Sequence, residues 1–309
     1  MGADGYYSAA PQGGWRAPGA PRPGSVPLRP LDLGDLMIGV ARTLRYAWPA
    51  MVGLGLAAGL ITGLIQVACV WNGPTHWVFG WFQWLVVPLL GGMISQLVMG
   101  AAATGVSRGV LGERSRLADC FSGLRGRIPT LLMTGFVTTG LGLLLTVATT
   151  VLFRLGRSLY PIGGLLVLVA MIGFVVGCAY LAVHLAFAPV VAVLEQSGWH
   201  RTLARSWQLA GLAPWRVLGV LLLTGMVAGA VALLPAYFLV ATMSLAVARS
   251  SAAFGFGLAS VPLISGIVWA LAVPLASSSV TLLYIDLRMR HENLAPALAQ
   301  AAAARRLQQ

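Results

Sequence analysis

The sequence has 309 residues, of which 58% are hydrophobic and only 9% are charged. Soluble domains carry about 45–50% apolar and about 25% charged residues, so this composition excludes a soluble enzyme and a disordered regulator. All the basic residues are arginines, and 20 of them against 8 acidic residues give a formal net charge of +12. A membrane protein reaches such a charge through arginines in its cytoplasmic loops. We therefore expect a membrane protein with no nucleic-acid partner.

The two ends of the chain differ from its middle. Residues 1–28 are dominated by Gly, Pro and Ala and show no hydrophobic periodicity, which predicts a disordered cytoplasmic tail. This segment lacks the apolar core of a secretory signal peptide. Residues 296–309 predict a second cytoplasmic tail, rich in Ala and Arg. Between the tails, residues 29–295 predict one membrane domain.

Six long apolar stretches predict six transmembrane helices. Each stretch is near or above the roughly 20 residues that a helix needs to cross about 30 Å of hydrocarbon. None shows the alternation of a barrel strand, so we expect an all-α membrane protein. The predicted spans are Trp48–Val70, Phe79–Val106, Pro129–Phe153, Pro161–Leu194, Pro214–Met243 and Gly255–Leu287.

The arginines indicate the orientation of these spans. Outside the distal tail, all but three arginines fall on the side that also holds both chain ends, and the exceptions are Arg154, Arg157 and Arg249. All acidic residues after Asp4 fall on the arginine-rich side as well. The positive-inside rule then predicts a multi-pass protein of the cytoplasmic membrane with both termini in the cytoplasm.

A recurring proline predicts an internal repeat. Pro49, Pro129 and Pro214 each follow a short, partly polar segment and precede an odd-numbered span. Proline is well tolerated in the first turn of a helix. We therefore predict three direct repeats, each with a cytoplasmic interfacial helix followed by two spans. Their approximate bounds are 31–112, 113–197 and 198–290. The even-numbered spans contain Pro88, Pro189 and Pro274, which should kink them.

No motif for metal, cofactor or catalysis is present. The four histidines lie in different segments without a second ligand three or four residues away, and there is no C-x-x-C, Walker A or G-x-S-x-G motif. We expect no cofactor, no metal and no catalytic residue. The glycine runs GLGLAAGLITG and TTGLGLLL are typical of helix–helix packing in membranes.

Charged residues at the inner membrane boundary are the best candidates for a binding surface. Arg201 and Arg205 are four residues apart and share a helix face, as do Asp35 and Arg42, which are seven apart. Such arginines would hold a phosphate-bearing lipid or a partner protein. The candidate residues are Asp35, Arg42, Arg45, Glu195, Arg201, Arg205, Asp286, Arg288 and Arg290.

Three stretches carry a resemblance to a known family. They are LRPLDLGDLMIGVARTLRYAWP, VVAVLEQSGWHRTLARSWQLAGLAPWRVLGVLLLTG and LLYIDLRMRHENL. They resemble actinobacterial membrane proteins labelled "glycerophosphoryl diester phosphodiesterase membrane domain", over about residues 29–295. The most specific part is Glu195 to Trp215, together with Tyr284, Asp286 and Arg288. The resemblance implies a six-helix membrane module. It implies no phosphodiesterase activity, because in those enzymes the chemistry resides in a separate metal-dependent barrel that is missing here.

The combined expectation is a non-catalytic accessory or scaffold module of the membrane. Its expected partners are anionic membrane lipids, another membrane protein or a second copy of the chain. The alternative is a small transporter or exporter subunit with a path between the repeats. The spans offer it few polar residues, namely Gln66, Gln83, Gln96, His184 and scattered Ser and Thr, which argues against a charged substrate. An enzyme acting on lipid phosphodiesters is the third hypothesis.

Overall fold

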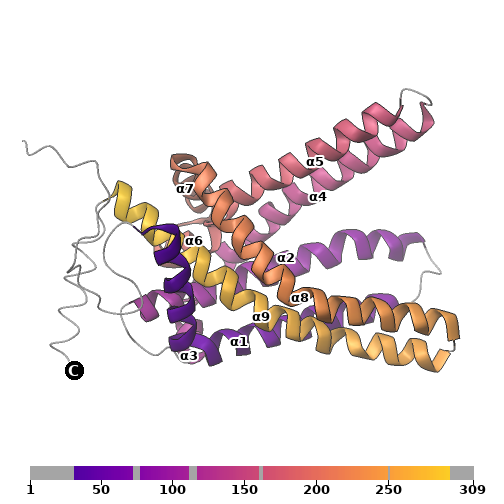
Figure 1. Cartoon of the computed structure of the whole chain (residues 1–309), viewed down its shortest axis with the longest axis horizontal. Helices are drawn as coiled ribbons and strands as arrows, with labels where there is room; N and C mark the ends of the chain where they lie inside the picture. The colour runs from indigo at the N-terminus through magenta and orange to yellow at the C-terminus, as the bar shows by residue number, and fades with distance from the viewer. Residues whose placement is uncertain (1–30, 72–76, 111–116, 160–162, 250, 293–309) are drawn as a thin grey trace, which may run out of the picture.

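The computed structural model describes residues 31–71, 77–110, 117–159, 163–249 and 251–292, and every regular element among them is an α-helix (Figure 1). Six helical segments are long and apolar enough to cross a membrane, which confirms the predicted all-α, six-span architecture. The predicted tails, 1–28 and 296–309, lie outside the described residues. The helices are α1 (Leu33–Trp71), α2 (Trp77–Val110), α3 (Leu117–Ser122), α4 (Ile128–Ser158), α5 (Gly163–Leu185), α6 (Ala188–Leu194), α7 (Trp199–Leu212), α8 (Pro214–Arg249) and α9 (Ser251–His291).

Two of the three recurring prolines stand where the sequence predicted them. Pro129 lies in the first turn of α4, and α8 begins at Pro214. A proline fits there because the first backbone N–H groups of a helix have no partner within it. Short helices precede both positions: α3 comes before α4, and α7 comes directly before α8.

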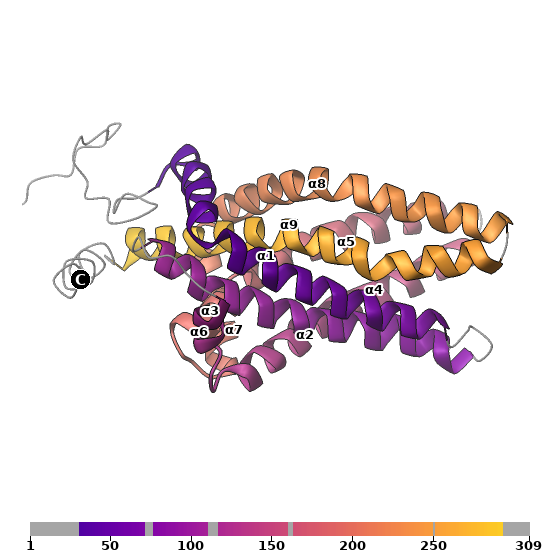
Figure 2. The same ribbon diagram turned by 90° about the horizontal axis from the view of Figure 1, so that it is seen from below.

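Two other prolines correct the prediction. Pro49 does not begin a helix but lies inside α1, so the predicted interfacial segment and the first span form one continuous helix. Figure 2 shows that the first turns of α1 point in a different direction from the rest. A proline inside a helix removes one backbone hydrogen bond and clashes with the preceding turn, which accounts for such a bend. The predicted fourth span is one apolar segment from Gly163 to Leu194, but two turn residues interrupt its helix just before Pro189, which lies in the first turn of α6.

The contact between α1 and α9 is the most extensive between any two described helices, and glycines allow the two backbones to approach. Gly55, Gly59 and Gly63 lie one turn apart on α1 and face the backbone of α9. A methyl group at Gly55 would lie 2.7 Å from the Cα of Ala270, and one at Gly59 would lie 2.6 Å from the Cα of Gly266. The first glycine run therefore packs helices, as predicted.

The second glycine run behaves differently. A methyl group at Gly140 or Gly142 would meet nothing within 4 Å in the described part of the chain. The prediction that this run packs against another helix is therefore wrong at these two positions. α4 packs against α2 and α5 at other positions, but no described residue covers it at these two glycines.

The main hydrophobic core lies at one end of the bundle. It gathers Leu36 and Met51 of α1, Val106 of α2, Phe187 just before α6, and Leu283 of α9. From this end, α4 and α5 run together away from the pair α8–α9 (Figure 1). We call the core end the charged end, because the first turns of α1, the helices α3 and α7, and the last turns of α9 bring most of the described charges there.

Candidate functional site

A fully buried carboxylate marks the last turns of α9. Asp286 is 0% exposed. Arg216, in the first turn of α8, places its Nη2 2.8 Å from Asp286 Oδ2. Arg290, one turn further along α9, donates from its Nε to Asp286 Oδ1 at 3.1 Å. The backbone N–H of Leu31 donates to the same oxygen at 2.7 Å. A buried charge is tolerated only when it is paired and hydrogen-bonded, and Asp286 is both.

The same arrangement fixes the start of α1. Arg216 and Arg290 both donate to the carbonyl oxygen of Leu31, two residues before the helix begins. Leu31 itself is fully buried. Because Leu31, Arg216 and Asp286 come from three distant parts of the sequence, this set, which we call the Asp286 clamp, joins α1, α8 and α9.

A second network surrounds Glu195. The chain turns after α6, where Gln196 has a φ of 51°, and α7 brings Arg205 to Glu195. Glu195 Oε1 accepts hydrogen bonds from the hydroxyl of Tyr284 at 2.7 Å and from Arg205 Nε at 3.3 Å. Arg288 donates to the Tyr284 hydroxyl at 3.1 Å.

Glu292 completes this network, which we call the Glu195 network. Arg288 donates from its Nε to Glu292 Oε2 at 2.6 Å, and Arg205 also pairs with Glu292. Burial by itself raises the pKa of Glu292, but hydrogen bonds from Arg288 and Arg205 outweigh it and lower this pKa. Burial likewise lowers the pKa of Arg205, and the hydrogen bond to Glu292 with the charge of Glu195 raises it above its ordinary value. Two carboxylates thus neutralise two arginines.

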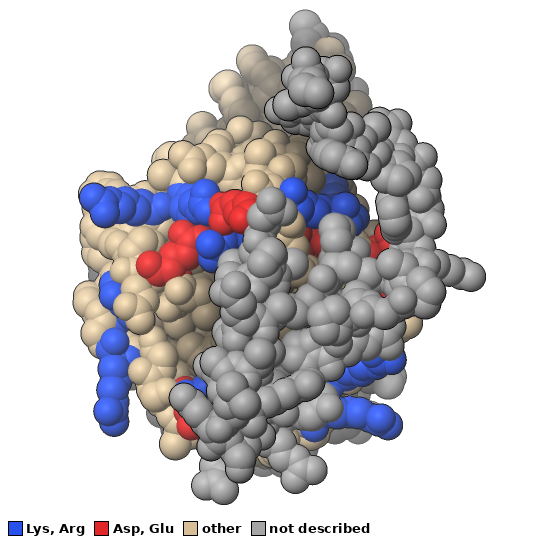
Figure 3. All heavy atoms as spheres, turned by 90° about the vertical axis from the view of Figure 1, so that its left-hand side faces the viewer, with Lys and Arg blue, Asp and Glu red and all other residues tan. Residues whose placement is uncertain are grey.

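Other arginines at the charged end point outward. Arg42 and Arg45 of α1, Arg125 after α3, and Arg201 of α7 are exposed. The ion pairs found within the described ranges involve none of these four. Figure 3 shows basic and acidic side chains side by side in a band across this end, with further arginines near its edge.

Large apolar side chains are exposed next to these arginines. Trp48 is exposed on α1 near Arg45, and Phe121 is exposed on α3 near Arg125. Trp207 of α7 is half exposed, and Trp215 at the start of α8 is 82% exposed. Tryptophan and arginine together are typical of the boundary between hydrocarbon and headgroups. The charged end therefore carries the side chains of a membrane–water interface.

The predicted site residues thus separate into groups. Five of them, Glu195, Arg205, Asp286, Arg288 and Arg290, form the Asp286 clamp and the Glu195 network. Arg42, Arg45 and Arg201 are exposed at the same end, and Asp35 is half-buried in α1. The structure therefore brings the nine together at one end of the bundle without making them one pocket.

The candidate set omitted three participants. Arg216 joins the Asp286 clamp, Glu292 joins the Glu195 network, and Leu31 contributes its backbone. A sequence signal exists for Glu292, since it lies four residues after Arg288, the spacing of an ion pair on a helix. Arg216 also has a sequence signal, because it is the only charged residue in the first turn of α8. No sequence pattern around Leu31 predicts that its backbone takes part in the clamp.

Each carboxylate of the two networks is paired with an arginine or a phenol hydroxyl. Within the described ranges, no group of three or more His, Cys, Asp or Glu side chains could hold a metal ion. What the arrangement can do is lock helices together and present exposed arginines to an anion.

Comparison with known proteins adds no family to this description. No family model matches the chain, and no curated protein or solved structure matches it either. The resemblance to the phosphodiesterase membrane domain therefore stays a prediction from the residues quoted above.

Proposed function

We propose that this protein is a non-catalytic accessory or scaffold module of the cytoplasmic membrane that binds anionic lipid headgroups at its charged end. The observation that carries the proposal is the pairing of exposed arginines with exposed tryptophan and phenylalanine side chains at that end. An arginine near an anionic membrane surface contributes about 1 kcal/mol of attraction. The binding residues are Arg42, Arg45 and Arg201, with Arg125 beside them.

In this proposal the Asp286 clamp and the Glu195 network hold the surface in shape. Their arginines already have carboxylate partners, so they have little capacity left for a lipid phosphate. The lipid-binding role therefore moves from the full set of nine predicted residues to the exposed ones. The resemblance to a family of membrane modules agrees with a role that needs no catalytic group.

The proposal includes the topology and the threefold repeat. The charged end faces the cytoplasm because it holds most of the arginines. The three units each consist of a polar segment followed by two spans. The positions of α3 and α7, each before a span with proline in its first turn, support the second and third units. The bent start of α1 supports the first, although it is continuous with its span.

Lipid retention tests the binding site. In nanodiscs of phosphatidylglycerol and phosphatidylcholine, the wild-type protein should enrich phosphatidylglycerol among its retained lipids, as measured by mass spectrometry. The triple variant Arg42→Ala, Arg45→Ala, Arg201→Ala should lose most of this enrichment. The matched control is Arg154→Ala with Arg157→Ala, two exposed arginines at the far end of α4. Equal enrichment in the triple variant, or equal loss in the control, would contradict the proposal.

Thiol labelling tests the topology separately. In a cysteine-free background, single cysteines replace Ala118 in α3 and Ser158 at the end of α4, both exposed positions. In intact cells, an impermeant thiol reagent should label position 158 and leave position 118 unlabelled. The reverse pattern would overturn the orientation.

A further inference from the structure

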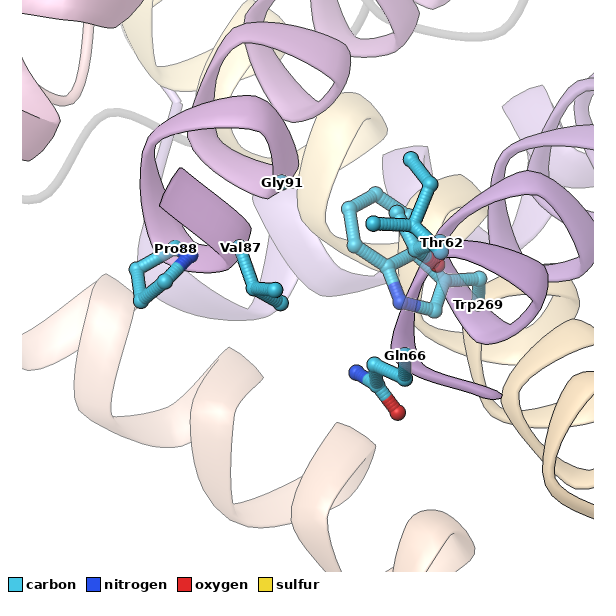
Figure 4. A pocket seen from close by; sticks show the side chains of 7 residues that line it. Thr62, Gln66, Val87, Pro88, Gly91 and Trp269 are labelled. Carbon is cyan, nitrogen blue, oxygen red and sulfur yellow. The ribbon is translucent and has the colours of Figure 1, made fainter. Parts of the chain in front are cut away.

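A pocket of about 240 Å³ lies between α1, α2 and α9, in the half of the bundle away from the charged end. Thr62 and Gln66 line it from α1, Pro88 and Gly91 from α2, and Trp269 from α9 (Figure 4). All the lining residues fall within helical segments that are long and apolar enough to cross a membrane, and Gln66 is two residues from the end of its segment. Neither the Asp286 clamp nor the Glu195 network contributes to it.

Two polar groups in this pocket have no hydrogen-bond partner among the residues that the structure describes. The side chain of Gln66 extends into the space between α1 and α2 (Figure 4), and it makes no hydrogen bond to any residue that the structure describes. The indole N–H of Trp269 has no acceptor among those residues either. By contrast, the hydroxyl of Thr62 donates to the carbonyl oxygen of Ala58 at 2.9 Å. An amide without a partner is costly in hydrocarbon, so Gln66 and Trp269 favour a ligand with a polar group.

The remaining walls restrict what that ligand is. Ile65, Val87 and Pro88 are apolar, and no charged residue lines the pocket. A carboxylate or a phosphate would lose its hydration without gaining a countercharge there. A methyl group added at Gly91 would meet nothing within 4 Å, so the pocket is open beside α2. Its volume is below the roughly 300–1,000 Å³ of pockets that enclose a drug-sized ligand.

We propose that this pocket binds the polar end of a neutral lipophilic molecule that carries a hydroxyl or carbonyl group. The amide of Gln66 and the indole N–H of Trp269 bond to that group, and the first carbons of its chain lie against Val87 and Pro88. The rest of the chain continues into the surrounding lipid. This site is independent of the anionic-lipid surface at the charged end.

Photo-crosslinking tests the site. The protein is placed in nanodiscs of phosphatidylglycerol and phosphatidylcholine with a long-chain alcohol that carries a diazirine near its hydroxyl, and labelled peptides are identified by mass spectrometry. Labelling should concentrate on residues 62–66 and 87–91, and unlabelled 1-hexadecanol should compete with it. A diazirine-bearing alkane of the same length should label these peptides about tenfold less, because it lacks the hydrogen-bonding group.

Two variants separate the pocket from general contact with lipid. Gln66→Leu should lower labelling by the alcohol to the level of the alkane. Gly91→Leu should fill the pocket and abolish labelling by both probes. The matched control is Gly142→Leu on α4, where an added methyl likewise meets nothing within 4 Å, and labelling should not change.

Three results would overturn the proposal. The first is labelling spread evenly over α4 and α5, or unchanged in Gly91→Leu. The second is labelling that 1-hexadecanol does not reduce, which would assign the pocket to ordinary bilayer phospholipid. The third comes from Gln66→Cys in a cysteine-free background: reaction with a charged thiol reagent as fast as at position 158 would indicate a water-filled path, as in a transporter.

Discussion

The pair α1–α9 and the hairpin α4–α5 are both built from long apolar helices, yet they differ in how much of their surface is buried inside the bundle. Within the apolar windows of α1 and α9, 44% and 33% of the residues are buried, against 0% in α4. Glycines bring α1 onto the backbone of α9, and the Asp286 clamp joins their ends at the charged end. Hydropathy thus determines which helices can enter a membrane, whereas small residues and buried charges determine which of these helices pack against each other.

The largest effect should come from the Asp286 clamp. Asp286→Ala leaves Arg216 and Arg290 without their carboxylate and should lower the free energy of unfolding by about 3–5 kcal/mol. Unfolding in mixed micelles of mild detergent and sodium dodecyl sulfate measures it. The control Asp119→Ala breaks a half-exposed ion pair with Arg108, for which we expect a loss of about 1 kcal/mol or less. Equal losses would show that the burial of Asp286 adds nothing to the free energy of unfolding beyond a half-exposed ion pair.

The next largest effect on stability should be a difference between glycine substitutions in α1 and in α4. Gly59→Ala places a methyl group against the backbone of α9, which cannot move aside as a side chain can, and should cost about 1–3 kcal/mol. Gly140→Ala on α4 meets open space and should be neutral, or stabilising by up to about 1 kcal/mol through helix propensity. Thermal unfolding in detergent compares the two variants. If both behave alike, the α1–α9 contact is looser than described.

A smaller effect is expected in the Glu195 network. Tyr284→Phe removes the hydroxyl that donates to Glu195 at 2.7 Å while keeping the buried ring. The loss should be about 1 kcal/mol, because Glu195 keeps Arg205 as a donor and is partly exposed, so that water can replace the hydroxyl. The same unfolding assay measures it. Tyr180→Phe is the control, because Tyr180 is half exposed and its hydroxyl makes no hydrogen bond within the described ranges.

The smallest effect should appear only as a pH dependence. Since Arg288 and Arg205 lower the pKa of Glu292 in the folded protein, the ionised carboxylate stabilises the fold above its ordinary pKa of 4.5. That contribution should vanish as the pH falls through the lower, folded-state pKa. Wild type should therefore be more stable than Glu292→Gln at neutral pH, and the difference should close in acid. A difference independent of pH would assign the role of Glu292 to packing. The α4–α5 hairpin contains no carboxylate and should not share this dependence.

The sequence anticipated much of the fold because hydrocarbon imposes a strict rule. A backbone in lipid must satisfy its own hydrogen bonds, so each long apolar stretch becomes a helix. The roles of individual prolines were harder to predict. Pro129 and Pro214 begin helices as expected, whereas Pro49 lies within one and Pro189 follows a break. Whether a proline bends or ends a helix depends on what its neighbours pack against, and local sequence does not contain that information.

The same limit separated the candidate residues. By itself, the sequence determined that the chain folds into long apolar helices, and it predicts that Glu195, Asp286 and the surrounding arginines lie at a membrane boundary, because charges are excluded from hydrocarbon. Only the tertiary structure decided which arginines are held by carboxylates and which are exposed. Asp286 and Leu31 are 255 residues apart, and they meet because α1 and α9 pack backbone against backbone. Such a contact depends on the geometry of two distant helices, which no local pattern of residues specifies.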